Sequence, residues 1–102
     1  MFYSLMRLTT WQARVLKEFL ALRNADVQLN VGKDHVSAEI TRGVVRESLT
    51  IWDTGSLYYA YAIDAPPTRL VYAWYFDGEN LRPEGDTPDW GLPPYWLEQA
   101  LR

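Results

Sequence analysis

The feature that most constrains the fold is the aromatic-rich stretch 49–76, LTIWDTGSLYYAYAIDAPPTRLVYAWYF. It holds eight of the chain's fifteen aromatic residues, and β-branched and aromatic side chains favour a pleated, half-buried surface. Its two breaks, at 53–55 and 64–67, carry the Asp, Gly and Pro residues that are typical of turns. We therefore predict three consecutive strands at the centre of an antiparallel sheet.

The second and third of these strands, 57–63 and 70–76, contain no charged residue. Side chains alternate between the two faces of a strand, so large side chains fall on one face and Ala60, Ala62 and Ala73 on the other. A sheet with one face in water alternates apolar with polar residues, and these strands do not. We therefore expect both faces to be covered, with either the end of the chain or a partner lying over the alanine face.

The remaining elements follow from periodicity and turn residues. Apolar residues repeat at helical spacing over 9–24, and Thr9 and Gln12 stand at the two positions of a capping box. Alternation predicts earlier strands at 26–31, 35–41 and 44–52. Breakers and acids make 77–93 an irregular acidic loop, and a short helix over 94–102 is expected to dock on the alanine face.

The sequence thus predicts one α+β domain over residues 1–102. An N-terminal segment, 1–8, leads into a helix, 9–24, which packs on an antiparallel meander sheet of about five strands, 26–76. The acidic loop, 77–93, and the short C-terminal helix, 94–102, complete the domain.

Composition narrows the class of function. The chain has no cysteine and a single histidine, His35, so we expect neither a metal site nor a cofactor. The start of the chain lacks the features of a signal peptide, and no stretch approaches the ~20 apolar residues of a membrane span, so we expect a cytoplasmic protein without a membrane partner. Residues 77–89 carry five acids against one arginine, a balance that disfavours nucleic acid as a partner.

One short motif has chemical precedent. Asp53-Thr54-Gly55-Ser56 resembles the Asp-Thr-Gly-Ser signature of aspartic proteases. That resemblance implies a homodimer in which two aspartates share a proton. The same residues also suit a hairpin turn, with Asp opening it and Gly in the left-handed conformation. The glycine-rich flap and second apolar-apolar-Gly loop of those enzymes are missing, so we interpret the motif as a turn and the protein as not an enzyme.

The combination of aromatic residues and acids predicts a protein-binding module. Tyrosine and tryptophan are typical anchors of interfaces, and acids steer a basic partner. We expect an inhibitor or immunity-type protein that neutralises a basic partner such as a nuclease toxin. The residues predicted to contact that partner are Tyr58, Tyr75, Asp77, Glu79, Glu84, Asp86, Asp89 and Trp90. The alternatives are a structural homodimer, joined through an open sheet face or an edge strand, and the homodimeric protease.

Overall fold

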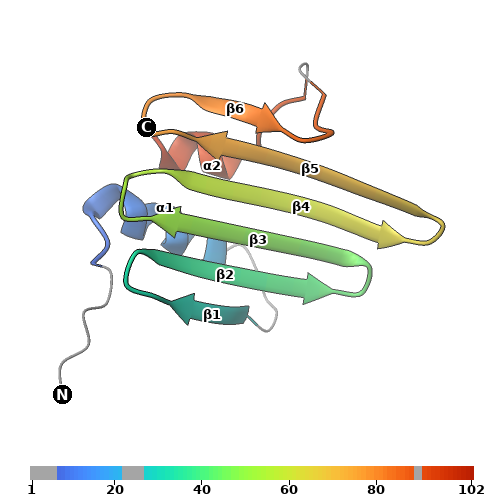
Figure 1. The fold of residues 1–102 in the computed structure, drawn as a ribbon, viewed down its shortest axis with the longest axis horizontal. Helices are drawn as coiled ribbons and strands as arrows, with labels where there is room; N and C mark the ends of the chain where they lie inside the picture. The colour runs from blue at the N-terminus through green and yellow to red at the C-terminus, as the bar shows by residue number, and fades with distance from the viewer. Residues whose placement is uncertain (1–6, 22–26, 89–90) are drawn as a thin grey trace.

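An antiparallel sheet of six strands in the order β1-β2-β3-β4-β5-β6 is the framework of the computed structural model, which describes residues 7–21, 27–88 and 91–102 (Figure 1). Each strand pairs with the next one along the chain, so the predicted α+β meander is confirmed. The elements in chain order are α1 (Thr10–Ala21), β1 (Val27–Val31), β2 (His35–Arg42), β3 (Val45–Trp52), β4 (Leu57–Ala65), β5 (Thr68–Phe76), β6 (Leu81–Glu84) and α2 (Tyr95–Ala100).

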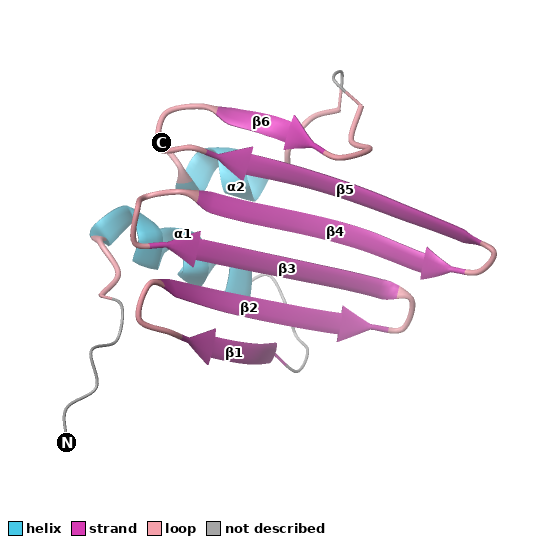
Figure 2. Ribbon diagram, viewed as in Figure 1, coloured by secondary structure: helices cyan, strands magenta, loops and turns pink. Residues whose placement is uncertain are grey.

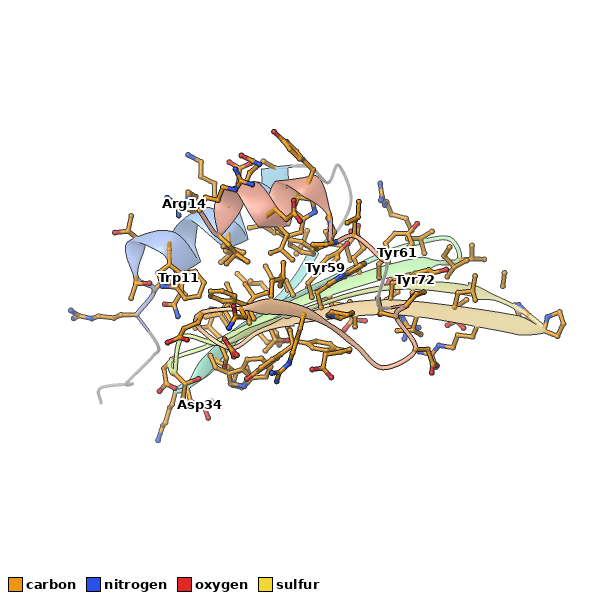
Figure 3. The ribbon with its side chains drawn as sticks, turned by 90° about the horizontal axis from the view of Figure 1, so that it is seen from above. Trp11, Arg14, Asp34, Tyr59, Tyr61 and Tyr72 are labelled. Atoms are coloured by element: carbon orange, nitrogen blue, oxygen red, sulfur yellow. The ribbon has the colours of Figure 1, made fainter. Side chains whose placement is uncertain are left out.

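Both helices lie on the same face of this sheet (Figures 2 and 3). The register aligns the large apolar side chains of neighbouring strands on that face. Leu49 stands opposite Tyr59, and Tyr59 opposite Trp74. The core lies between this face and the helices and includes Val15, Phe19, Val36, Ile40, Leu49, Ile51, Leu57, Tyr59 and Leu97.

Helix α1 confirms the predicted apolar stripe, since Val15 and Phe19 are fully buried. Half of the predicted capping box is also present, because the Thr9 N–H donates to Gln12 Oε1 at 2.9 Å. Gln12 Nε2 in turn donates to the Trp52 carbonyl at 3.0 Å, which joins the start of α1 to the end of β3. The predicted end of the helix at residues 22–24 lies outside the described residues.

Helix α2 corrects the prediction that the short helix covers the alanine face. It packs beside α1 on the opposite, aromatic face, where the ring of Trp96 lies 5.7 Å from Phe19 and 5.4 Å from Tyr59 between centroids. The physical reason is that Trp96 and Leu97 bury more apolar area among large rings than on a flat row of methyl groups. Arg14 of α1 fixes the end of α2, since its Nε donates to the Ala100 carbonyl at 2.9 Å.

Strand β6 corrects the prediction that 77–93 is irregular. Residues Leu81–Glu84 pair with the end of β5, so Phe76 stands opposite Leu81 and Ala73 opposite Glu84. Just beyond the strand, Thr87 Oγ1 accepts from the Ala73 N–H at 2.6 Å and donates to the Ala73 carbonyl at 3.1 Å. Pairing with the preceding strand therefore orders a segment whose prolines and glycines argue locally against a strand.

Neither described helix has the length and apolarity needed to cross a membrane.

Candidate functional site

The sheet face that points away from the helices, here called the open face, extends over the six strands of the sheet (Figure 3). None of the described helices or strands lies over it, as the edge-on view shows (Figure 3). Ala62 and Ala73 are nevertheless only 7% and 2% exposed. No described element of the chain supplies the cover expected over the alanine face (Figure 3), and cover by a partner stays a prediction. Tyr58, Ala60 and Val71 of the same face are half-buried.

Two tyrosines and an arginine stand side by side near one end of the open face. Tyr58, Tyr75 and Arg82 occupy matching positions on β4, β5 and β6, and we call them the tyrosine row. Both tyrosines are half-buried, and the Arg82 guanidinium carbon lies 5.1 Å from the centroid of the Tyr75 ring. Such cation–π contact fixes the arginine over the ring. The row is thus a semi-rigid aromatic surface edged by a cation.

Three hairpin turns meet at the end of the sheet next to this row. In an antiparallel meander the β1–β2, β3–β4 and β5–β6 turns all lie at one end (Figure 1). The Asp53 N–H donates to the Asp34 carbonyl at 2.8 Å, which ties the first two turns together. The turns carry four carboxylates, which we call the acidic end: Asp34, Asp53, Asp77 and Glu79. Lys33 is the one basic residue within these turns.

Local hydrogen bonds hold two of these carboxylates in their ionised form. His35 Nδ1 lies 2.7 Å from Asp34 Oδ1, and this hydrogen bond lowers the pKa of Asp34. The N–H groups of Asn80 and Glu79 both donate to Asp77 Oδ1 at 2.8 Å and lower the pKa of Asp77. Both groups are therefore charged at neutral pH and held in place by the turns that carry them.

The far half of the open face is electrically balanced. Arg46 lies 3.9 Å from Glu39 and 3.8 Å from Asp64, and Arg69 lies 3.7 Å from Asp64. Beneath these side chains, Ala60 and Ala62 line a shallow hollow of about 340 Å³. The net negative charge of the site is therefore confined to the acidic end.

Comparison of the chain with known protein families, with curated protein sequences and with solved structures gives no match. The functional argument therefore depends on the geometry of this surface.

The structure brings together about half of the residues predicted to contact a partner. Tyr58 and Tyr75 are direct cross-strand neighbours, and Asp77 and Glu79 lie at the adjacent acidic end. Glu84 lies on the open face at the edge of the sheet, where it pairs with Arg82 at 3.3 Å. Asp86 follows the opposite end of β6, away from the acidic end. The predicted contacts Asp89 and Trp90 lie outside the described residues.

Sequence reasoning missed Asp34 and Asp53 as members of this cluster. They are 43 and 24 residues before Asp77 in the chain, and nothing local links them. The available signal was topological, because alternate turns of a meander share one end of the sheet. Arg82 was also missed, although its position opposite Tyr75 depends on the unpredicted strand β6.

The Asp53-Thr54-Gly55-Ser56 motif is the β3–β4 hairpin turn, as interpreted from the sequence. The Gly55 N–H donates to the Trp52 carbonyl at 3.1 Å, and Gly55 has a φ of 92°, which favours glycine. Asp53 is exposed to solvent. In the described ranges, 7–21, 27–88 and 91–102, no group of three or more His, Cys, Asp or Glu residues has an arrangement that could hold a metal ion.

Proposed function

We propose that this protein is a small binding module that holds a basic protein partner against the tyrosine row and the acidic end. By this proposal it acts as an inhibitor or immunity-type protein, and its partner is a basic enzyme such as a nuclease toxin. The single observation that supports it best is the convergence of four carboxylates from three separate turns beside an aromatic row.

The tyrosine row and the acidic end would contribute to binding in different ways. Tyrosine and arginine are enriched among the residues that contribute most to binding, and Tyr58, Tyr75 and Arg82 are already restrained by their neighbours. Restraint before binding reduces the entropy lost on association. The acidic end adds a negative field that speeds the approach of a basic partner. Its carboxylates stay fixed because hydrogen bonds within the turns hold Asp34 and Asp77.

The test begins with capture of a partner from the source cells and identification of the captured protein. The purified pair is then measured by stopped-flow association at several salt concentrations, and by an activity assay of the partner. A variant with Asp34→Asn, Asp53→Asn, Asp77→Asn and Glu79→Gln keeps the side-chain acceptors but removes four charges. We expect its association rate to fall by roughly tenfold or more at low salt and to lose most of its salt dependence.

A control variant removes three acids from elsewhere on the surface, with Glu18→Gln, Asp86→Asn and Glu98→Gln. It should leave the association rate near that of the unchanged protein. Tyr58→Ala with Tyr75→Ala should instead raise the dissociation rate. If the captured partner is acidic, or if the control and the acidic-end variant behave alike, the proposed function is wrong.

A further inference from the structure

The two edges of the sheet differ in how they are protected. At the β6 edge, Pro83 lacks an N–H, and charged residues flank it at Arg82 and Glu84. Proline and charge at an edge prevent pairing with another strand. Strand β1, at the opposite edge, has the sequence VQLNV, with no charge and no proline. In the part of the chain that the structure describes, no strand pairs with its outer side.

The backbone of β1 presents a regular set of unpaired groups along this edge. The Gly32 N–H donates to the His35 carbonyl at 2.8 Å, so this pair is a hydrogen-bonded pair of the β1–β2 hairpin. Hydrogen-bonded and non-hydrogen-bonded pairs alternate along antiparallel strands. The N–H and C=O groups of Gln28 and Asn30 therefore point toward β2, and those of Val27, Leu29 and Val31 point outward.

The side chains of these outward-facing residues are also incompletely buried. Leu29 and Val31 are 50% and 45% exposed, although they lie on the apolar, helix-bearing face. Helix α1 adds to the apolar surface on this face. A groove of about 520 Å³ runs along it, lined by Leu8, Ala13, Leu16, Lys17, Leu20 and Ala21. The edge therefore combines free backbone groups with exposed aliphatic side chains.

We propose that the outer edge of β1 binds β1 of a second copy of this chain, antiparallel and centred on Leu29. This register places Leu29 opposite Leu29 of the copy and Val27 opposite Val31 of the copy. All of these residues point their backbone groups outward, so each opposed pair exchanges two hydrogen bonds. The two sheets then form one continuous sheet, with all helices on the same side.

The sequence of β1 suits its own copy better than a charged partner. In this register, aliphatic side chains meet aliphatic ones on the helix-bearing face, and Gln28 meets Asn30 of the copy on the other face. No like charges are opposed, and a twofold axis requires such self-complementarity. Five paired residues with a few aliphatic contacts form a small interface. We therefore expect dissociation in roughly the micromolar range.

Sedimentation velocity from roughly 1 to 300 µM tests the proposal. The apparent mass of the unchanged protein should rise with concentration from 11.9 kDa toward twice that value. Leu29→Lys should keep it at the monomer mass at all these concentrations, since it places like charges opposite each other. The matched control is Leu92→Lys, because Leu92 is 83% exposed and lies outside the sheet. This control should associate like the unchanged protein.

Amide hydrogen exchange of the full chain distinguishes this register from other dimers. The Leu29 and Val31 amides should gain at least tenfold protection at high concentration and lose it on dilution. Leu29→Pro removes an outward N–H and the leucine side chain but no hydrogen bond to β2, so it should abolish association while preserving the fold, as judged by circular dichroism. A monomer at all concentrations, or a dimer that persists with Leu29→Lys, overturns the proposal. Neither result bears on binding of a basic partner at the acidic end.

Discussion

At the scale of single residues, the most unusual feature is the carboxylate of Glu47 in the core. Glu47 is 4% exposed and sits on the apolar face of β3. Its Oε1 accepts a hydrogen bond from the Tyr59 hydroxyl at 2.6 Å, and its Oε2 lies 3.5 Å from the Arg42 guanidinium. A buried charge is tolerated only when paired and hydrogen-bonded, so these two partners explain why an acid interrupts an apolar pattern.

We predict that Tyr59→Phe destabilises the fold by about 1–3 kcal/mol, because it takes one hydrogen bond from a buried carboxylate. The ring contacts of Tyr59 with Phe19 and Trp74 are retained by phenylalanine. Urea unfolding followed by tryptophan fluorescence gives the free energy. The control is Tyr61→Phe on the same strand, whose hydroxyl makes no hydrogen bond in the described residues. Equal losses for the two variants would contradict this account.

At the scale of elements, the spacing of apolar residues predicted those helices and strands that depend mainly on local sequence. Alternation located β1 to β5 to within a few residues, and helical periodicity located α1. The sequence did not predict β6 or the sheet face on which α2 packs, since both depend on contacts with residues that are distant in the chain. Leu81 pairs opposite Phe76, and Trp96 packs against Phe19 and Tyr59. For the candidate site, Tyr58 and Tyr75 were predicted from composition. That Asp34 and Asp53 lie at the same end of the sheet as these tyrosines could be known only from the strand order.

Thr87 offers a test of how β6 and its following turn are held. Thr87 is 7% exposed, and its hydroxyl both accepts from the Ala73 N–H and donates to the Ala73 carbonyl. Thr87→Val keeps the shape but leaves both backbone groups without this partner. We expect a loss of about 1–3 kcal/mol in unfolding free energy and faster exchange of the Ala73 amide.

Thr50→Val is the comparison for Thr87→Val, since Thr50 is a half-buried threonine in the middle of the sheet. Its substitution should change the free energy of unfolding by less than about 0.5 kcal/mol. An Ala73 amide that exchanges at the original rate in Thr87→Val would show that the threonine hydroxyl does not hold this edge.

At the scale of the whole molecule, charge is unevenly divided between the two ends of the sheet. One end gathers Asp34, Asp53, Asp77 and Glu79, whereas Glu39, Arg46, Asp64 and Arg69 balance each other toward the other end. The acids lie in the β1–β2, β3–β4 and β5–β6 turns, and the meander places these three turns at the same end of the sheet.

The acidic end also predicts how stability depends on pH. The pKa values of Asp34 and Asp77 are lowered from 3.8, so their ionised forms favour the folded state. This contribution is fully present about one pH unit above the unfolded-state value of 3.8 and is lost as pH falls through the lower, folded-state values. Asp34→Asn with Asp77→Asn should therefore flatten the decline in thermal midpoint between roughly pH 5 and pH 2.5. An identical decline in the variant and in the unchanged protein would refute the assignment.

The placement of both helices on one side has a consequence for any pair joined at β1. Such a pair has two layers, with all helices on one side of a continuous sheet and one continuous open face on the other side. The two tyrosine rows on that face are related by a twofold axis perpendicular to the sheet. Their acidic ends then point in opposite directions. A ligand that is itself twofold symmetric, with basic patches at matching spacing, would be gripped at two points, and its second contact would form at high effective concentration.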